Sequence, residues 1–289
     1  MTVAVLCDIA CELGEGPTYD RHTDTLWWFD IVRAKLIEKP LAAGRVTFHD
    51  LPMMASVLVR VDGDRQLLAT EAGLYLRDTT SGRLTLHRDI EAGNRATRSN
   101  DGRVHPCGAL WVGTMGKKAE KRAGAIYWYR AGELRRLFAD VTIPNSICFS
   151  PDGAVAYFAD TVTNRIMRVD CDPATGLPVG EPKVFHDNRD DEGWPDGSVC
   201  DADGTMWNAR WGAGAVDAYA PDGRRLRSIA IPARQSSCPA FAGARLDRLA
   251  VTSAFQGMGA AARDIDRQAG FTFIADVAVR GRPEPDVAL

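Results

Sequence analysis

The chain has 289 residues, of which 45% are hydrophobic and 25% are charged, a composition typical of a soluble globular protein. The formal net charge of −3 argues against a general affinity for nucleic acid or anionic membranes. No segment approaches the roughly 18 apolar residues of a membrane span, and the apolar residues 3–6 lack the basic flank of a signal peptide. We therefore expect neither nucleic acid nor a membrane as a partner.

In chain order, the first element is a short apolar strand over residues 3–8. After it, an apolar pair of residues that follows a turn occurs six times. The intervals between successive pairs are 41, 43, 46, 50 and 43 residues. The six anchor pairs are Leu26-Trp27, Leu67-Leu68, Leu110-Trp111, Ala156-Tyr157, Met206-Trp207 and Leu249-Ala250. A period of about 40–50 residues, made of short strands and turns, is typical of β-propeller blades. The repeat predicts six blades and one closed domain over residues 1–289.

Each repeat also carries strand and turn signals around its anchor pair. A second apolar strand follows, as at residues 164–167, and then a glycine turn, as at Gly82 or Gly223. Glycine adopts the positive φ of a tight hairpin without steric cost. With the strand before each anchor pair, these signals predict an all-β fold with four antiparallel strands per blade. The N-terminal strand is expected to close the ring by completing the last blade.

Two repeats contain insertions. Residues 114–122 precede the strand of residues 124–129, and residues 255–268 separate the last anchor pair from the strand at 270–273. Insertions in repeat proteins map to loops, often on the binding face. The first insertion is expected to be either a lid over the central channel or a solvated loop.

The seven cysteines stand at irregular spacings and form no Cys-x-x-Cys pair. Cys148, Cys171 and Cys200 lie in apolar, strand-like stretches, where a free thiol packs as a small hydrophobe. The sequence therefore predicts reduced, mostly buried thiols and a cytoplasmic protein.

Four repeats place an oxygen-bearing side chain ten or eleven residues before the anchor pair: Glu15, Asn100, Asn145 and Asp196. Equivalent positions of equivalent blades lie at one depth around the propeller axis. If they begin the innermost strands, these side chains converge in the channel. The alternative is that they belong to ordinary turns, as do the Pro-Asp-Gly sequences at residues 151–153 and 221–223.

Carboxylates and amides crowded in a channel of low dielectric would repel one another and lose hydration. A divalent cation resolves this conflict, with charge from Glu15 and Asp196 and neutral oxygens from Asn145 and, as a candidate fourth ligand, Asn100. Such oxygen ligands suit Ca²⁺, Mg²⁺ or Mn²⁺, and the lack of histidine argues against a dedicated zinc site. Arg98 should point the same way as Asn100, where it suits an anionic or polyhydroxyl ligand; a surface ion pair is the alternative.

Four short motifs in this order on a six-fold repeat resemble the senescence-marker-protein/gluconolactonase/luciferin-regenerating-enzyme family, which includes regucalcin. The motifs are Leu13-Gly-Glu-Gly-Pro17, Arg98-Ser-Asn-Asp101, Pro144-Asn145 and Pro195-Asp-Gly197. The resemblance implies a six-bladed β-propeller that binds one divalent metal and hydrolyses sugar-acid lactones. It further implies metal ligation by Glu15, Asn145 and Asp196, substrate contacts from Arg98 and Asn100, and a general-base role for Asp196.

We therefore expect an aldonolactone to be hydrolysed to its aldonic acid, with the metal polarising the carbonyl and Asp196 assisting attack by water. A metal-bound carboxylate is a weak base, so a hydroxide on the metal is the rival account. Ca²⁺ is the favoured ion, while Mg²⁺, Mn²⁺, Zn²⁺ and Fe²⁺ stay open. The alternative functions are a regucalcin-like calcium-binding regulator and a related phosphotriesterase or aryl-ester lactonase. The sequence identifies neither the lactone nor the oligomeric state, and no obligatory protein partner is evident.

Overall fold

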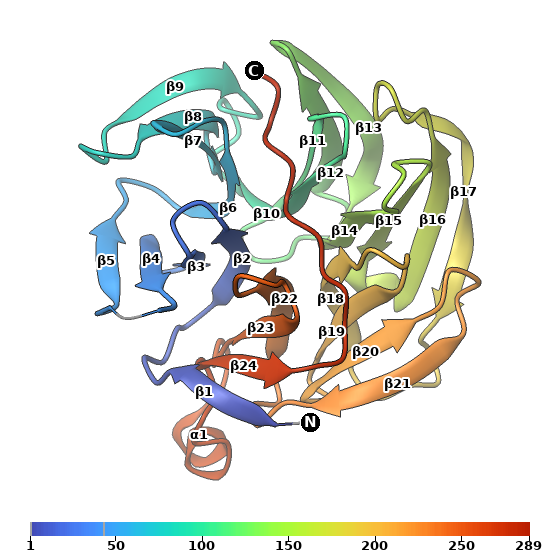
Figure 1. Cartoon of the computed structure of the whole chain (residues 1–289). Coiled ribbons are helices and arrows are strands. Elements are labelled where there is room, and N and C mark those ends of the chain that lie inside the picture. The colour runs from blue at the N-terminus through green and yellow to red at the C-terminus, as the bar shows by residue number, and fades with distance from the viewer. Residues whose placement is uncertain (1, 43) are drawn as a thin grey trace.

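The structure, a computed structural model, describes residues 2–42 and 44–289. In this part of the chain, six four-stranded antiparallel sheets surround a central axis (Figure 1). The predicted six-bladed β-propeller is therefore confirmed. One 3-10 turn, η1 (Thr161–Thr163), and one short helix, α1 (Ala260–Ile265), complete the described elements. No described helix is long and apolar enough to cross a membrane.

The first three blades follow one another along the chain, each from its inner to its outer strand. Blade 1 consists of β2 (Gly14–Asp20), β3 (Thr25–Asp30), β4 (Lys35–Pro40) and β5 (Thr47–Asp50). Blade 2 consists of β6 (Ala55–Arg60), β7 (Arg65–Thr70), β8 (Gly73–Asp78) and β9 (Leu84–Asp89). Blade 3 consists of β10 (Thr97–Val104), β11 (Leu110–Gly116), β12 (Gly124–Arg130) and β13 (Glu133–Val141).

The remaining blades complete the ring. Blade 4 consists of β14 (Pro144–Phe149), β15 (Val155–Asp160), β16 (Arg165–Cys171) and β17 (Pro178–Asp187). Blade 5 consists of β18 (Trp194–Cys200), β19 (Met206–Trp211), β20 (Ala215–Tyr219) and β21 (Arg225–Ala230). Blade 6 consists of β22 (Ser236–Ala242), β23 (Arg248–Ser253), β24 (Thr272–Asp276) and β1 (Val3–Cys7).

The N-terminal strand closes the ring as predicted. β1 pairs antiparallel with β24, with Val3 opposite Ala275 and Val5 opposite Phe273. The two strands lie side by side in Figure 1, although they come from opposite ends of the chain. Because blade 6 contains the first and the last strand of the chain, its hydrogen bonds close the ring between blade 6 and blade 1.

The core lies between adjacent blades. The anchor pairs occupy the second strand of each blade, and every residue of β3 is buried, whereas β5 on the outside is largely exposed. A strand packed on both faces reads as a continuous apolar run, which explains the anchor pairs. Between blades 3 and 4, the rings of Trp111 and Phe149 meet edge to face with centroids 5.4 Å apart. The cysteines are unpaired and all but Cys107 are buried, as predicted.

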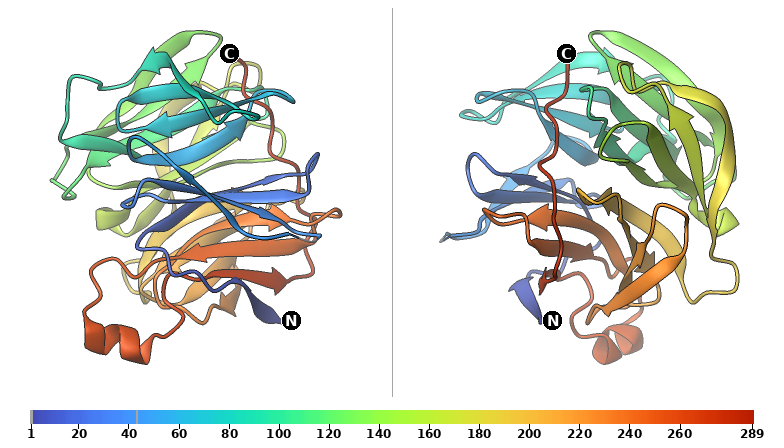
Figure 2. Two further views of the ribbon diagram at one scale, coloured as in Figure 1. Left: turned by 90° about the vertical axis from the view of Figure 1, so that its left-hand side faces the viewer. Right: turned by 45° about the vertical axis from the view of Figure 1, so that its right-hand side comes forward.

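The first insertion is shorter than predicted, and the second contains a short helix. Thr114 to Gly116 extend β11, because they pair with Thr97 to Ser99 at the start of β10. The first loop therefore begins at Lys117 and not at Thr114. The second insertion contains α1, which projects from the ring (Figure 2).

The C-terminal segment, residues 277–289, crosses one end of the ring (Figure 1). The Arg282 guanidinium donates hydrogen bonds to the carbonyl oxygens of Phe149 (2.6 Å) and Cys200 (3.1 Å), which end β14 and β18. The Val287 N–H donates to the carbonyl of Arg60 (2.9 Å), which ends β6. The segment thus covers the carboxyl ends of the inner strands and leaves their amino ends on the other side.

Candidate functional site

A cavity of about 400 Å³ lies at the amino ends of the inner strands. The side chains singled out in the sequence all line it: Glu15, Arg98, Asn100, Asn145 and Asp196. They come from β2, β10, β14 and β18, and so from four different blades. The expected convergence is therefore met. The volume suits a small-molecule ligand.

A β-bulge lies at the start of each of these four inner strands. The register shifts between Glu15 and Thr18 in β2, and between Asn145 and Cys148 in β14. Comparable shifts follow Ser99 in β10 and Pro195 in β18. A bulge bends the strand and redirects a side chain, so it places the residue at the channel mouth instead of within the blade.

The residue after Glu15 must be glycine for a local reason. Gly16 has a φ of +57°, and an added Cβ would collide with the carbonyl oxygen of Ser56 in the next blade. Its N–H donates to Oε2 of Glu15 at 3.1 Å. This hydrogen bond holds one oxygen of the Glu15 carboxylate in place.

A chain of hydrogen bonds connects the polar side chains across the cavity. Nη1 of Arg98 donates to Oδ1 of Asn100 (2.8 Å), whose Nδ2 donates to Oδ1 of Asn145 (2.9 Å). Nδ2 of Asn145 then donates to Oγ1 of Thr161, and this hydroxyl donates to the carbonyl of Pro195, both at 2.9 Å. Each donor fixes which way the next amide faces. The Thr161 contribution was missed in the sequence, because this residue lies in η1 and no repeat position marks it.

The surroundings of the cavity disfavour the ionised form of its carboxyl groups. Burial raises the pKa of Glu15 to about 8, and the charge of Asp101 adds to the rise. Burial, Glu15 and Asp101 raise the pKa of Asp196 well above its ordinary value. The nearby Arg98 remains a cation at neutral pH, because burial lowers its pKa only to about 10.

Asp101 is a third buried carboxylate, to which the sequence assigned no role. Its oxygens accept hydrogen bonds from the main-chain N–H groups of Ile147 (2.7 Å) and Gly102 (2.9 Å). Burial nevertheless raises its pKa to about 6. Asp101 therefore ties blade 3 to blade 4 and adds negative charge behind Glu15 and Asp196.

The donor set fits a hard divalent cation. Glu15, Asp196 and Asn145 line the same cavity, and burial together with repulsion from neighbouring carboxylates disfavours the ionised form of both carboxyl groups. Within residues 2–42 and 44–289, no group of three or more His, Cys, Asp and Glu side chains is arranged to hold a metal. The fit therefore depends on an amide oxygen completing the set.

The loop after β11 and two further side chains form the rim. Residues 115 and 117–119 line the cavity, as do Trp211 and Gln256. Lys117 forms an ion pair with Glu71 of blade 2. Trp194, at the start of β18, is 49% exposed and does not line the cavity.

A second cavity of about 360 Å³ lies at the opposite end of the inner strands, beneath the C-terminal segment. Its buried Arg103 pairs with Glu284 at 3.0 Å, and its Arg60 pairs with Asp286 at 2.5 Å. Because these charges are already compensated within the protein, the first cavity is the better candidate site.

Residues 13–255 match the family described as the SMP-30/Gluconolactonase/LRE-like region. A protein of Rhizobium meliloti named "Putative sugar lactone lactonase" is 54% identical over 97% of this chain and 95% of its own length. An L-arabinolactonase of Azospirillum brasilense is 36% identical over 94% of this chain and 90% of its own length. The crystal structure of a calcium-binding protein, regucalcin, from Agrobacterium tumefaciens matches with a TM-score of 0.97 at 51% identity, over 99% of this chain and 97% of that chain.

Proposed function

Because the chain belongs to the SMP-30/gluconolactonase/LRE-like family, we propose that it is a carboxylic-ester hydrolase that opens a sugar-acid lactone to the aldonic acid. The observation that carries the proposal is the gathering of Glu15, Asn145 and Asp196 around one cavity with Arg98. The lactonase names of its relatives support the substrate class.

Glu15, Asn145 and Asp196 would hold one divalent cation. Oxygen ligands favour Ca²⁺, and the calcium-binding protein at 51% identity supports this choice. Held there, the cation would supply Lewis acidity, which would polarise the lactone carbonyl and favour negative charge on its oxygen.

Arg98 and Asn100 hold the sugar hydroxyls. Nη1 of Arg98 is engaged by Asn100 and by the carbonyl of Ser99, both at 2.8 Å. The other guanidinium donors have no partner among the described residues, and the side chain lines the cavity. A buried, immobilised guanidinium of this kind positions a polyhydroxyl ligand at little entropic cost.

Asp196 takes a proton from the attacking water. Burial and then repulsion from Glu15 and Asp101 raise the pKa of Asp196, so compensation of the surrounding negative charge would favour its ionised form. A carboxylate in this setting is a weak base, which is sufficient for the reactive ester of a lactone.

The test is acid release from a panel of aldonolactones by EDTA-treated protein, with and without added Ca²⁺ and other divalent ions. Asp196→Asn should lower kcat by about 100-fold or more, whereas Arg98→Ala should chiefly raise KM. Small and comparable losses in both variants would remove Asp196 from the chemistry.

Calcium binding without catalysis is the second candidate, favoured by the regucalcin relative. The third candidate is hydrolysis of a phosphotriester, and a phosphotriester in the same panel tests it. Ca²⁺ binding without turnover of any ester would support the binding role, and turnover of the phosphotriester alone would replace the lactone by that substrate.

A further inference from the structure

One blade departs from the repeat directly behind Asp196. The residue after the anchor pair is apolar and buried in five blades, as Trp28, Ala69, Val112, Phe158 and Val251. In blade 5 the same position holds Asn208, on β19. Asn208 is fully buried, and its Oδ1 has no hydrogen-bond partner. A buried amide with an unsatisfied oxygen is unfavourable compared with an apolar side chain, so something else must account for it.

The amide nitrogen of Asn208 lies against the main chain of the Asp196 strand. Its shortest hydrogen bonds go to the carbonyl of Asp196 and to Oγ of Ser198, both at 2.9 Å. The Asp196 carbonyl accepts a second hydrogen bond, at 2.7 Å, from Oγ of Ser146 on β14. Nδ2 of Asn208 is also 3.1 Å from this hydroxyl. Three strands thus meet at the Asp196 carbonyl.

Ser146 connects this junction to the other side of the cavity. It directly follows Asn145 and has a φ of +60°, a conformation that is unfavourable for a residue with a Cβ. The hydrogen bond from Ser146 to the Asp196 carbonyl helps to hold this conformation. The positions of Asn145 and Asp196 therefore depend on one shared hydrogen-bond junction.

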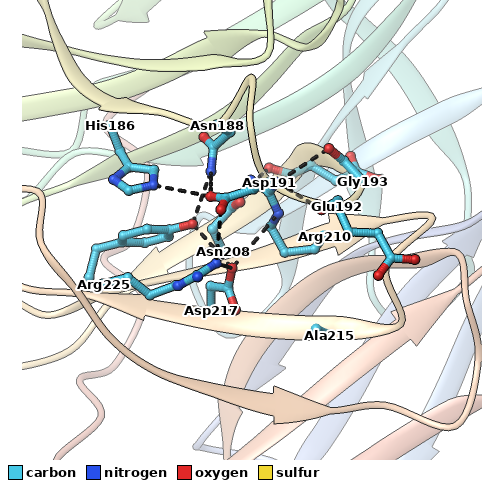
Figure 3. Close-up of polar contacts among 12 residues, drawn as sticks. His186, Asn188, Asp191, Glu192, Gly193, Asn208, Arg210, Ala215, Asp217 and Arg225 are labelled. Atoms are coloured by element: carbon cyan, nitrogen blue, oxygen red, sulfur yellow. Dashed lines mark hydrogen bonds and ion pairs between the residues drawn. The ribbon is translucent and has the colours of Figure 1, made fainter.

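A second side chain of β19 supports the segment that precedes the Asp196 strand. Arg210 donates to the carbonyl oxygens of Glu192 (3.0 Å) and Gly193 (3.2 Å), in the segment that leads into β18 (Figure 3). Arg210 also lies 3.8 Å from the carboxylate of Asp217. Because β19 secures both the entry to β18 and its bulge, the strand of Asp196 is constrained on both sides.

We propose that Asn208 is a positioning residue that sets the geometry between Asp196 and Asn145. This inference rests on the proposed function, in which those two side chains hold a cation. Loss of the junction would leave both ligands present but displaced, which weakens cation binding and catalysis together.

The test is Asn208→Val, because Val112 and Val251 occupy this position in two other blades. The variant should fold, because the other five blades accommodate an apolar side chain at this position. Supporting groups of this kind typically contribute 10–100-fold to metal affinity or activity. We expect the Kd for Ca²⁺, from calorimetric titration of EDTA-treated protein, to rise about 10–100-fold, with a similar fall in kcat.

Asn188→Val is the matched control. Asn188, labelled in Figure 3, is also fully buried with an unpaired Oδ1, and its Nδ2 donates to the Tyr219 hydroxyl at 3.1 Å. Asn188 does not line the cavity. It should lose stability without a change in Ca²⁺ affinity or kcat. A purely structural Asn208 would behave in the same way.

Wild-type Ca²⁺ affinity and kcat in Asn208→Val would overturn the inference. If that variant fails to fold, Ser146→Ala decides, because it removes the other donor to the same carbonyl and should weaken Ca²⁺ binding. A wild type that binds Ca²⁺ but opens no lactone refutes the proposed reaction alone, since affinity still reports on Asn208. A wild type that binds no Ca²⁺ overturns the metal site and this role with it.

Discussion

Without a bound cation, the stability of this protein should depend on pH through Glu15. In the metal-free protein, burial and then the Asp101 charge raise the pKa of Glu15 from an ordinary 4.5 to about 8. The folded protein therefore holds a proton that the unfolded chain releases. The stabilisation is fully present below pH 4.5 and is lost as the pH rises toward 8.

The magnitude follows from the pKa values. Each pH unit in this window costs up to about 1.4 kcal/mol, so the change from pH 5 to pH 7 costs at most about 3 kcal/mol. Glu15 retains partial contact with solvent, which makes this an upper bound. At about 2 °C per kcal/mol for a chain of this size, Tm should fall by up to roughly 6 °C.

The assay is thermal unfolding of EDTA-treated wild type and Glu15→Gln between pH 5 and pH 8, followed by circular dichroism. Glu15→Gln cannot titrate, so its Tm should be less dependent on pH. Burial lowers the pKa values of His87 and His105, which gives an opposing trend, but these histidines are common to both proteins and cancel in the comparison. Saturating Ca²⁺ should flatten the wild-type curve. Parallel metal-free curves for the two proteins would refute the reasoning.

Two further predictions concern the surroundings of the proposed cation site. Thr161→Val removes the acceptor that orients the Asn145 amide, and should lower kcat by about 10–100-fold in steady-state assays; an unchanged kcat would mean that Asn100 alone fixes this amide. Replacing Lys117 and Lys118 by alanine should raise KM for the lactone without altering kcat, because both line the mouth of the cavity; an unchanged KM would identify the loop as merely solvated.

The features that sequence analysis missed or placed wrongly share one cause: local patterns do not encode contacts between strands. Thr114 to Gly116 have no distinct composition, and only their pairing with β10 makes them part of β11. Asp101 stands within a recognised motif, yet its role depends on the N–H of Ile147 in the next blade. Asn208 breaks the repeat visibly, but its significance appears only with Asp196 beside it.

The sequence by itself determined the number of blades, the closure by the N-terminal strand and the common depth of Glu15, Asn100, Asn145 and Asp196. It could do so because a fixed repeat maps distance along the chain onto position around a ring. Only the tertiary structure decided how these side chains are oriented and supported. Those properties come from hydrogen bonds and buried charges between residues of different blades, which no spacing along one strand specifies.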